Sequence, residues 1–172
     1  IERVIAGPER KSRLITKEEK RIVAYHEAGH AVVMNSLSEA NPVQKVSIIA
    51  RGMAAGYTIS LPMEDQTLMP RKKLIAEMIG LLGGRAAEEL VFDDITSGAS
   101  NDIERVTQLA RTMVTRLGMS AELGPMVYGQ KEELIFLGRE ISEQRDYSES
   151  VAEKIDKEVR TLVNDAYNQA KS

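Results

Sequence analysis

Two histidines and a glutamate form the part of this sequence best suited to catalysis. His26, Glu27 and His30 occur as His-Glu-x-x-His, and the 172-residue chain contains no other histidine. Side chains four residues apart on an α-helix share one face, so two imidazoles at this spacing can reach one zinc ion. Gly29, between them, would keep side-chain bulk away from the ion. The spacing therefore predicts a zinc site on a helix.

Glu27 has the position of a general base and not of a ligand. Because it is adjacent to His26, it is hard to bring onto the same ion, but it can contact a water beside the ion. There a carboxylate takes a proton as the water attacks a peptide carbonyl, and it returns the proton to the leaving amine. The predicted reaction is zinc-dependent peptide hydrolysis. The plainer interpretation, two ordinary histidines on an amphipathic helix, is less favoured because both histidines fall in the motif.

A catalytic zinc site also needs a third protein ligand and an open position. The three-histidine extension of the motif is absent, because Val33 and Ser36 stand where its Gly and His would be. The third ligand should then be a carboxylate, and spacing leaves these candidates open: Glu64, Asp65, Glu88, Glu89, Asp93, Asp94, Asp102 and Glu104. Position favours Asp102 and Glu88, although the helix dipole alone could explain a negative charge at Asp102 in a first helical turn.

The motif lies in a segment with its own helix signals. Thr16 and Glu19 form a capping box, and apolar residues recur at helical spacing to about Leu37, before Asn41-Pro42. Alternating residues then predict two short strands at 46–48 and 57–61. Their simplest interpretation is a core hairpin, which we consider as well supported as a role in substrate binding.

The rest of the chain is predicted to be largely helical. Periodicity indicates helices over about 71–91, from the polar turn 96–101 to about 117, and from about 148 to the end, with a short hairpin within 126–137. Gly118 would end the third helix. The second helix contains Gly80, Gly83 and Gly84; glycine costs about 1 kcal/mol against alanine there, so we expect close packing against a neighbour.

These elements predict a mainly α domain with a small β-hairpin or sheet element. Residues 1 to about 15 are charged and contain Gly7-Pro8, so we expect a linker there and the folded domain over residues 16–172. The sequence does not begin with Met, and its last predicted helix lacks a capping signal. We therefore expect a part of a longer chain, cut short at its C-terminal end.

The composition argues against several other functions. The net charge is -3, which provides no basic field for nucleic acid. The absence of cysteine excludes disulfides and cysteine zinc ligands. No apolar run approaches the roughly 20 residues needed to span a bilayer. The sequence also contains no G-x-x-x-x-G-K-[ST] loop for binding ATP phosphates.

Beyond these local signals, the sequence resembles the peptidase domain of the FtsH family, the AAA+ zinc proteases of bacterial, mitochondrial and chloroplast membranes. The resemblance covers nearly the whole chain, and the combination of HEAGH with GASND in this order is highly specific. The matching segments are VAYHEAGHAVV (23–33), VQKVSIIARGMAAGYTISLP (43–62), GGRAAEELVF (83–92), TSGASNDIERVTQLARTMVTRLGMS (96–120), LGPMVYG (123–129) and FLGRE (136–140).

The resemblance implies a complete site. By it, His26, His30 and Asp102 bind Zn²⁺, and Glu27 is the catalytic base. Asp102 is thus favoured where spacing left the choice open, and Glu88 becomes a candidate for orienting one of the ligands. The implied activity is that of a zinc endopeptidase. The alternative is a catalytically silent pseudoprotease that serves as a hexamer-forming scaffold.

The resemblance also implies a setting. Such enzymes are homo-hexamers in which an ATPase ring unfolds membrane and soluble proteins and threads them to the peptidase domains. ATP would be used by an upstream module outside this sequence and would not be bound by this domain. The full-length protein would be anchored in a membrane through N-terminal segments, with this domain on the cytoplasmic, matrix or stromal side. A smaller self-sufficient peptidase is disfavoured by the linker-like start.

Overall fold

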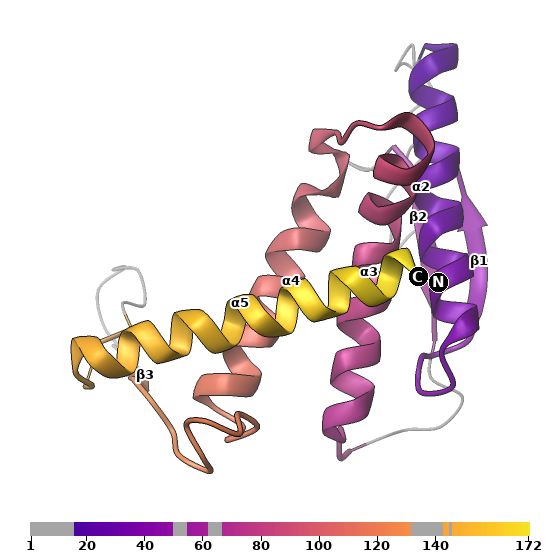
Figure 1. The fold of residues 1–172 in the computed structure, drawn as a ribbon. Helices are drawn as coiled ribbons and strands as arrows, with labels where there is room; N and C mark the ends of the chain where they lie inside the picture. Colours follow the sequence, from indigo (N-terminus) through magenta and orange to yellow (C-terminus); the bar gives the residue numbers. More distant parts are fainter. Residues whose placement is uncertain (1–15, 50–54, 62–66, 132–142, 145) are drawn as a thin grey trace, which may run out of the picture.

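A computed structural model describes residues 16–49, 55–61, 67–131, 143–144 and 146–172. In these residues the chain is mainly helical with a small antiparallel sheet, as the sequence predicted (Figure 1). The predicted linker before residue 16 lies outside the described residues. No helix within the described ranges combines the length and apolarity needed to cross a membrane.

Helix α2, Lys17–Ser36, carries the His-Glu-x-x-His motif, and its start is the predicted capping box. The Thr16 hydroxyl accepts a hydrogen bond from the backbone N–H of Glu19 at 3.1 Å. In return, the Glu19 carboxylate accepts the backbone N–H of Thr16 at 2.8 Å. These reciprocal bonds satisfy two backbone groups that a helix start would otherwise leave without partners.

Strands β1, Val43–Ser47, and β2, Tyr57–Ser60, form an antiparallel pair that packs on α2. Val46 lies opposite Thr58 in this ladder, and Ser47 lies opposite Tyr57. The predicted first strand extended to Ile48, but β1 ends one residue earlier. The Ser47 hydroxyl accepts the backbone N–H of Ile49 at 3.2 Å, a local bond that competes with continued strand pairing.

Three further helices complete the domain. They are α3, Arg71–Phe92; α4, Ser100–Thr115, which follows the 3₁₀ turn η1, Ser97–Ala99; and α5, Glu149–Lys171. Helix α4 ends two residues before the predicted Leu117, and Gly118 follows in the left-handed region with φ +59°. In Figure 1, α5 runs across α3 and α4, while α2 and β1 lie on the side of α3 away from α4.

A second strand pair forms at the far end of the domain. β3, Gln130–Lys131, pairs with β4, Glu143–Gln144. The predicted hairpin within 126–137 was therefore wrong about its second strand, which lies beyond that range. Residues 132–142 between the two strands lie outside the described part of the chain.

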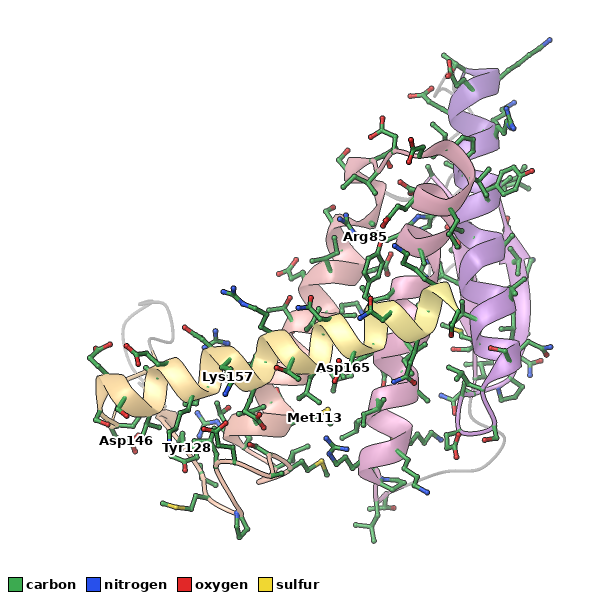
Figure 2. The ribbon with its side chains drawn as sticks, in the orientation of Figure 1. Arg85, Met113, Tyr128, Asp146, Lys157 and Asp165 are labelled. Atoms are coloured by element: carbon green, nitrogen blue, oxygen red, sulfur yellow. The ribbon has the colours of Figure 1, made fainter. Side chains whose placement is uncertain are left out.

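The hydrophobic core lies between α3, α4 and α5. Met78, Val106, Ala110, Met113 and Val114 are completely buried in it, and Ile155 of α5 is 1% exposed. Figure 2 places Met113 on α4 beside α5. Burial of apolar area on this scale is the main source of stability in a small domain, so these three helices form the frame on which α2 packs.

Helices α2 and α3 approach each other through glycines. A Cβ atom on Gly29 would lie 2.4 Å from the carbonyl oxygen of Gly83, and one on Gly83 would lie 2.7 Å from the carbonyl oxygen of Gly29. The predicted close packing of the glycine-containing helix is confirmed. The predicted role of Gly29 was wrong, because Gly29 faces the α3 backbone and makes room for that helix instead of for an ion.

Candidate metal centre

The two histidines of the motif occupy the side of α2 that faces α3. Both are buried, His26 with 8% and His30 with 6% of its surface exposed. Their Nε2 atoms lie 3.1 Å apart, and the rings meet edge to face. One turn of α-helix separates them in the sequence, which brings both side chains to the same place.

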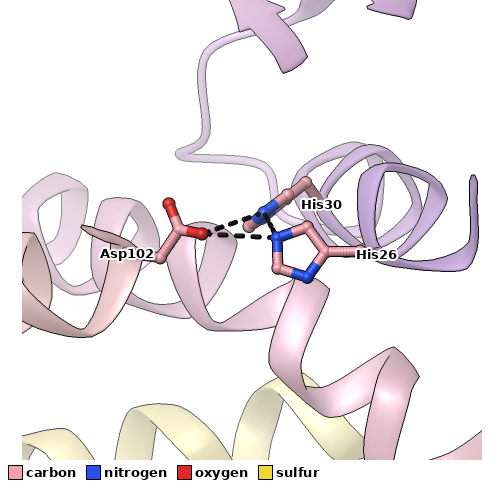
Figure 3. A group of neighbouring side chains, drawn as sticks. All are labelled: His26, His30 and Asp102. Atoms are coloured by element: carbon pink, nitrogen blue, oxygen red, sulfur yellow. Dashed lines mark hydrogen bonds and ion pairs between the residues drawn. The ribbon is translucent and has the colours of Figure 1, made fainter. Parts of the chain in front are cut away.

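The third member of the group arrives from a different part of the chain. Asp102 lies in the first turn of α4, after the 3₁₀ turn that Thr96 caps by accepting the backbone N–H of Gly98. Its Oδ2 atom is 3.4 Å from Nε2 of His26 and 3.5 Å from Nε2 of His30. Figure 3 shows the three side chains converging from α2 and α4.

The spacing of these three atoms fits a tetrahedral zinc ion. Zinc binds nitrogen and carboxylate oxygen at about 2.0–2.2 Å, so two ligand atoms at a tetrahedral ion lie about 3.3–3.5 Å apart. The three observed separations are 3.1, 3.4 and 3.5 Å. Within the described ranges, His26, His30 and Asp102 are the one group of three or more side chains whose ligand atoms come together in this way.

Hydrogen bonds on the far side of each ring set which nitrogen faces the centre. Nδ1 of His30 lies 2.8 Å from the carbonyl oxygen of Gly80, and Nδ1 of His26 lies 2.6 Å from Oε1 of Glu88. A carbonyl oxygen can only accept, so Nδ1 of His30 carries the proton and Nε2 of the neutral ring presents its lone pair. A carboxylate at Nδ1 favours the same tautomer for His26.

Glu88 is itself held in place. It is 1% exposed, and its Oε2 atom accepts the backbone N–H of Thr96 at 2.7 Å. Thr96 belongs to the turn that leads into α4, so one buried carboxylate connects His26 to the segment that carries Asp102. Outer hydrogen bonds of this kind fix the orientation of metal ligands in proteins.

Charge around the centre shifts two pKa values in opposite directions. Burial alone would lower the pKa of His26 and raise that of Asp102. Hydrogen bonds and charge from Asp102 and Glu88 outweigh burial and raise the pKa of His26 above 6.5. Hydrogen bonds and charge from the two histidines likewise outweigh burial and lower the pKa of Asp102 well below 3.8. Asp102 therefore stays ionised near neutral pH and would bring a negative charge to a cation bound at this site.

The α3 backbone passes close to the donor atoms at Gly84. A Cβ atom there would lie 2.5 Å from Nε2 of His26 and 2.6 Å from Nε2 of His30. Contacts this short would push both rings out of position. Glycine at this place therefore keeps the two nitrogens at the spacing that a metal requires.

Glu27 lies beside the centre and is 6% exposed. Burial raises the pKa of its carboxyl above 4.5, and a hydrogen bond from Thr58, together with the charges of His30 and His26, opposes that rise. The hydroxyl of Thr58 is 2.7 Å from Oε2 of Glu27. A carboxylate whose pKa is raised by burial holds a proton more readily than an exposed one, which suits a general base.

The other carboxylates proposed from spacing lie away from the three donor atoms or outside the described residues. Glu89 contacts Tyr167 and Lys171 of α5. Asp93 is the left-handed residue that ends α3, with φ 51°, and Asp94 accepts the backbone N–H of its neighbour Ile95. Glu104 is exposed on α4, and residues 64 and 65 are not among those described.

Sequence reasoning missed three groups that contact the site residues. They are the carbonyl oxygen of Gly80, the backbone N–H of Thr96 and the hydroxyl of Thr58. The polar turn beginning at Thr96 gave a capping signal, but nothing in the sequence connected it to Glu88. Thr58 is 31 residues from Glu27 in the chain, and only the packing of the sheet on α2 brings them together.

This fold and this site define a class of protein. A helix with His-Glu-x-x-His, joined by an aspartate from a second helix, inside a mainly helical domain, is the arrangement of a zinc metallopeptidase domain. Comparison with known proteins then gives the family. Residues 13–172 match the model of peptidase family M41, and the chain belongs to that family.

Curated relatives agree with this placement. The chain is 58% identical, over 172 residues, to the ATP-dependent zinc metalloprotease FtsH of Thermotoga maritima, covering 99% of this chain and 28% of the relative. It is 58% identical over 170 residues to that of Rubrobacter xylanophilus, covering 99% of this chain and 26% of the relative. It is 53% identical over 172 residues to FtsH 1 of Thermoanaerobacter sp., covering 100% of this chain and 28% of the relative. The chain thus spans little more than a quarter of these relatives.

Proposed function

We propose that this chain is a zinc-dependent endopeptidase domain in which His26, His30 and Asp102 hold the zinc ion and Glu27 is the general base. The observation that carries the proposal is the set of three facing acceptor atoms, 3.1–3.5 Å apart, with the buried Glu27 beside them. When both rings are neutral with the proton on Nδ1, as their outer hydrogen bonds favour, three lone pairs face one another and repel, and a cation removes that repulsion.

The protein residues divide the work of hydrolysis between them. A zinc ion bound there would supply Lewis acidity, which polarises a peptide carbonyl and lowers the pKa of water toward about 7. Glu27 accepts the proton of the attacking water and passes it to the nitrogen of the leaving amine, so the same carboxylate acts first as base and then as acid. Its buried position keeps bulk water from competing for that proton.

We further propose that Glu88 orients His26. Its Oε1 atom accepts the Nδ1 proton at 2.6 Å, which keeps the lone pair of Nε2 directed at the centre. The carbonyl of Gly80 does the same for His30 at 2.8 Å. The two rings are therefore held by acceptors of different charge, and the carboxylate makes His26 the more strongly held of the two.

For the whole protein we propose ATP-dependent degradation of membrane and soluble proteins by a homo-hexamer. The names of the relatives, which include ATP dependence, support the energy source. The family resemblance supports the hexamer, a membrane anchor formed by segments outside this sequence, and a cytoplasmic, matrix or stromal side for this domain. Unfolded polypeptide would then be the substrate that reaches Glu27.

The proposal is tested by cleavage of a fluorescently labelled unfolded polypeptide. Cleavage should require no ATP, stop when a chelator removes the metal, and return when zinc is added, with one zinc bound per chain. The Glu27→Gln variant should keep its zinc but lose about 100-fold or more in turnover, the usual contribution of a general base. A zinc-loaded wild-type protein that cleaves nothing would instead support the pseudoprotease scaffold.

A further inference from the structure

The β1–β2 sheet reaches the proposed catalytic base through one side chain. The hydroxyl oxygen of Thr58, in β2, lies 2.7 Å from the carboxylate oxygen Oε2 of Glu27 and 3.1 Å from the backbone carbonyl oxygen of the same residue. Both neighbours of the hydroxyl are acceptors, so Thr58 is the donor. A single hydroxyl group of the sheet therefore contacts both the backbone and the carboxylate of Glu27.

A second residue of the same segment lies against the same side chain. A Cβ atom on Gly56 would be 2.8 Å from Oε1 of Glu27 and 2.9 Å from its Cγ. Gly56 and Thr58 are two residues apart, so they lie on one face of the sheet segment, the face toward α2. Oε1 of Glu27 thus lies against the backbone of Gly56, and Oε2 accepts the hydroxyl proton of Thr58.

This contact limits the freedom of a side chain that would otherwise rotate. A glutamate has three side-chain torsions, and a general base has to be held within hydrogen-bond reach of the proton it takes. Thr58 spans the two ends of Glu27, its backbone and its carboxylate, and so restricts the torsions between them. The pairing of Thr58 with Val46 in the β1–β2 ladder fixes the strand from which the hydroxyl extends.

We propose that Thr58 is a positioning residue for peptide hydrolysis, which holds the Glu27 carboxylate in the orientation that accepts a proton. The inference rests on the proposed function, since it concerns the base of that reaction. It assigns a catalytic purpose to the small sheet, beyond its packing on α2. Thr58 touches none of the three donor atoms, so zinc binding does not depend on it.

A purely structural role for Thr58 would give a different result. If the hydroxyl only fastened β2 to the helix through the carbonyl of Glu27, its loss would lower the thermal unfolding midpoint and leave the turnover of the folded protein unchanged. Loss of positioning instead lowers kcat in a protein that remains folded. KM and zinc content would then stay close to wild type, because neither the ligands nor the substrate contacts have changed.

The test compares Thr58→Val, Thr58→Ser and Thr58→Ala with wild type, with steady-state cleavage, zinc content and thermal unfolding measured for each. Thr58→Val should lower kcat by about 10- to 100-fold, the range for losing a hydrogen bond to a charged group, with KM within about twofold and one zinc per chain. Thr58→Ser keeps the hydroxyl and should stay within about threefold of wild type. If valine prevents folding, the serine and alanine variants make the same comparison.

Ser60→Ala is the matched control. Ser60 lies two residues further along β2, on the same face, and lines a small cavity beside Met34. Its loss should leave kcat unchanged. The inference is overturned if Thr58→Val keeps the wild-type kcat, or if Thr58→Ser is as slow as Thr58→Ala. A wild-type protein that binds zinc and cleaves nothing overturns the proposed function itself, and the inference with it.

Discussion

Two rows of residues on α3 have opposite compositions. Gly80, Gly84 and Glu88, the site row, are spaced by four residues and face α2, where they meet Met34, both motif histidines and His26 respectively. The core row is Met78, Leu82 and Ala86, with 0%, 3% and 1% of its surface exposed. Each residue of the core row precedes a residue of the site row by two positions. Two positions correspond to about 200° around the helix, so the two rows face nearly opposite directions.

The difference indicates that one helix serves folding with one row of residues and the proposed metal site with the other. The core row supplies apolar surface to the cluster shared with α4 and α5, and that burial stabilises the domain. The site row contributes almost no apolar side chain. Its glycines let the α3 backbone approach the histidines of α2 closely, and Glu88 adds one buried carboxylate. Substitutions in the two rows should therefore change different measured quantities.

The largest effect is expected in the core row, from Met78→Ala. Truncating a fully buried methionine leaves a cavity and should lower the free energy of unfolding by about 2–5 kcal/mol. Urea denaturation of the metal-free protein measures this change. Zinc affinity, determined at a temperature at which the variant stays folded, should remain within about twofold of wild type. A folded Met78→Ala protein that fails to bind zinc would contradict the separation of the two rows.

The next largest effect is expected in the site row, from Gly84→Ala. The new Cβ atom would lie 2.5 and 2.6 Å from the two Nε2 atoms, so both rings must move and the donor spacing is lost. Zinc affinity should fall by more than the roughly 100-fold at the upper end for outer-shell substitutions. The metal-free protein should be destabilised less than by Met78→Ala, because the preference of a helix for alanine over glycine, about 1 kcal/mol, offsets part of the cost of moving the two rings.

Competition with a chromophoric chelator gives the affinity of Gly84→Ala, and urea denaturation gives its stability. Gly80→Ala is a useful comparison, since its Cβ atom would meet the flexible side chain of Met34 at 2.9 Å and no donor atom. Full zinc binding by Gly84→Ala would mean that the two rings have room to spare, and that zinc binding does not require glycine at that position.

The sequence allowed most of the fold to be predicted because its signals are local. A capping box, apolar periodicity and the glycine after α4 each act within a few residues, and they placed the helices to within two residues at their ends. The predictions that were wrong concerned contacts between residues far apart in the sequence. Gly29 could not be assigned its neighbour from spacing, and the partner strand of β3 lies 12 residues away along the chain, beyond the predicted hairpin.

The same distinction applies to the site. The two histidines and Glu27 are recognisable together because four residues make one helical turn. Asp102 and Glu88 were equivalent by spacing, since each depends on how a second helix packs on α2. The structure separates them: Asp102 approaches both Nε2 atoms, and Glu88 approaches Nδ1 of His26 from behind. Thr58 had no local signal at all, because a strand register and a sheet–helix contact bring it to Glu27.

A smaller effect is expected from Glu88→Gln. The amide keeps the shape, but its single oxygen can accept only one of the two protons that the carboxylate receives, from Nδ1 of His26 or from the backbone N–H of Thr96, and the bond is no longer charge-assisted. Zinc affinity should fall by about 10- to 100-fold, and the metal-free protein should be destabilised less than by Met78→Ala. The chelator competition used for Gly84→Ala also measures this change. Unchanged zinc affinity and turnover would remove Glu88 from the site.

Zinc affinity should also depend on pH, by about tenfold per unit. The pKa of His26 in the metal-free protein is raised above 6.5, because the carboxylates of Glu88 on α3 and Asp102 on α4 outweigh burial. Zinc needs the neutral ring, so below that raised pKa each bound ion must displace a proton and affinity falls as pH falls. Zinc titrations between about pH 5.5 and 8 measure the slope, and an affinity independent of pH would contradict histidine ligation.

The smallest effect is expected from Glu89→Gln, one residue from Glu88 in sequence and on a different face of α3. Its carboxylate accepts hydrogen bonds from Lys171, at 2.7 Å, and from Tyr167, both on α5. Arg85, which Figure 2 labels, lies over the ring of that tyrosine. The bonds from Lys171 and Tyr167 lower the pKa of Glu89, so its contribution to stability is present above about pH 4.5 and is lost as pH falls through the lowered pKa.

Glu89→Gln should therefore lower the unfolding midpoint by a few degrees at most near pH 7, the range for an exposed ion pair, and the difference from wild type should disappear in acid. Zinc affinity should not change. Glu89→Gln is a direct control for Glu88→Gln, because the two substitutions remove the same charge from adjacent residues of one helix. Loss of zinc in Glu89→Gln would mean that the contact with α5 positions the metal ligands, and that α3 does not separate folding from metal binding.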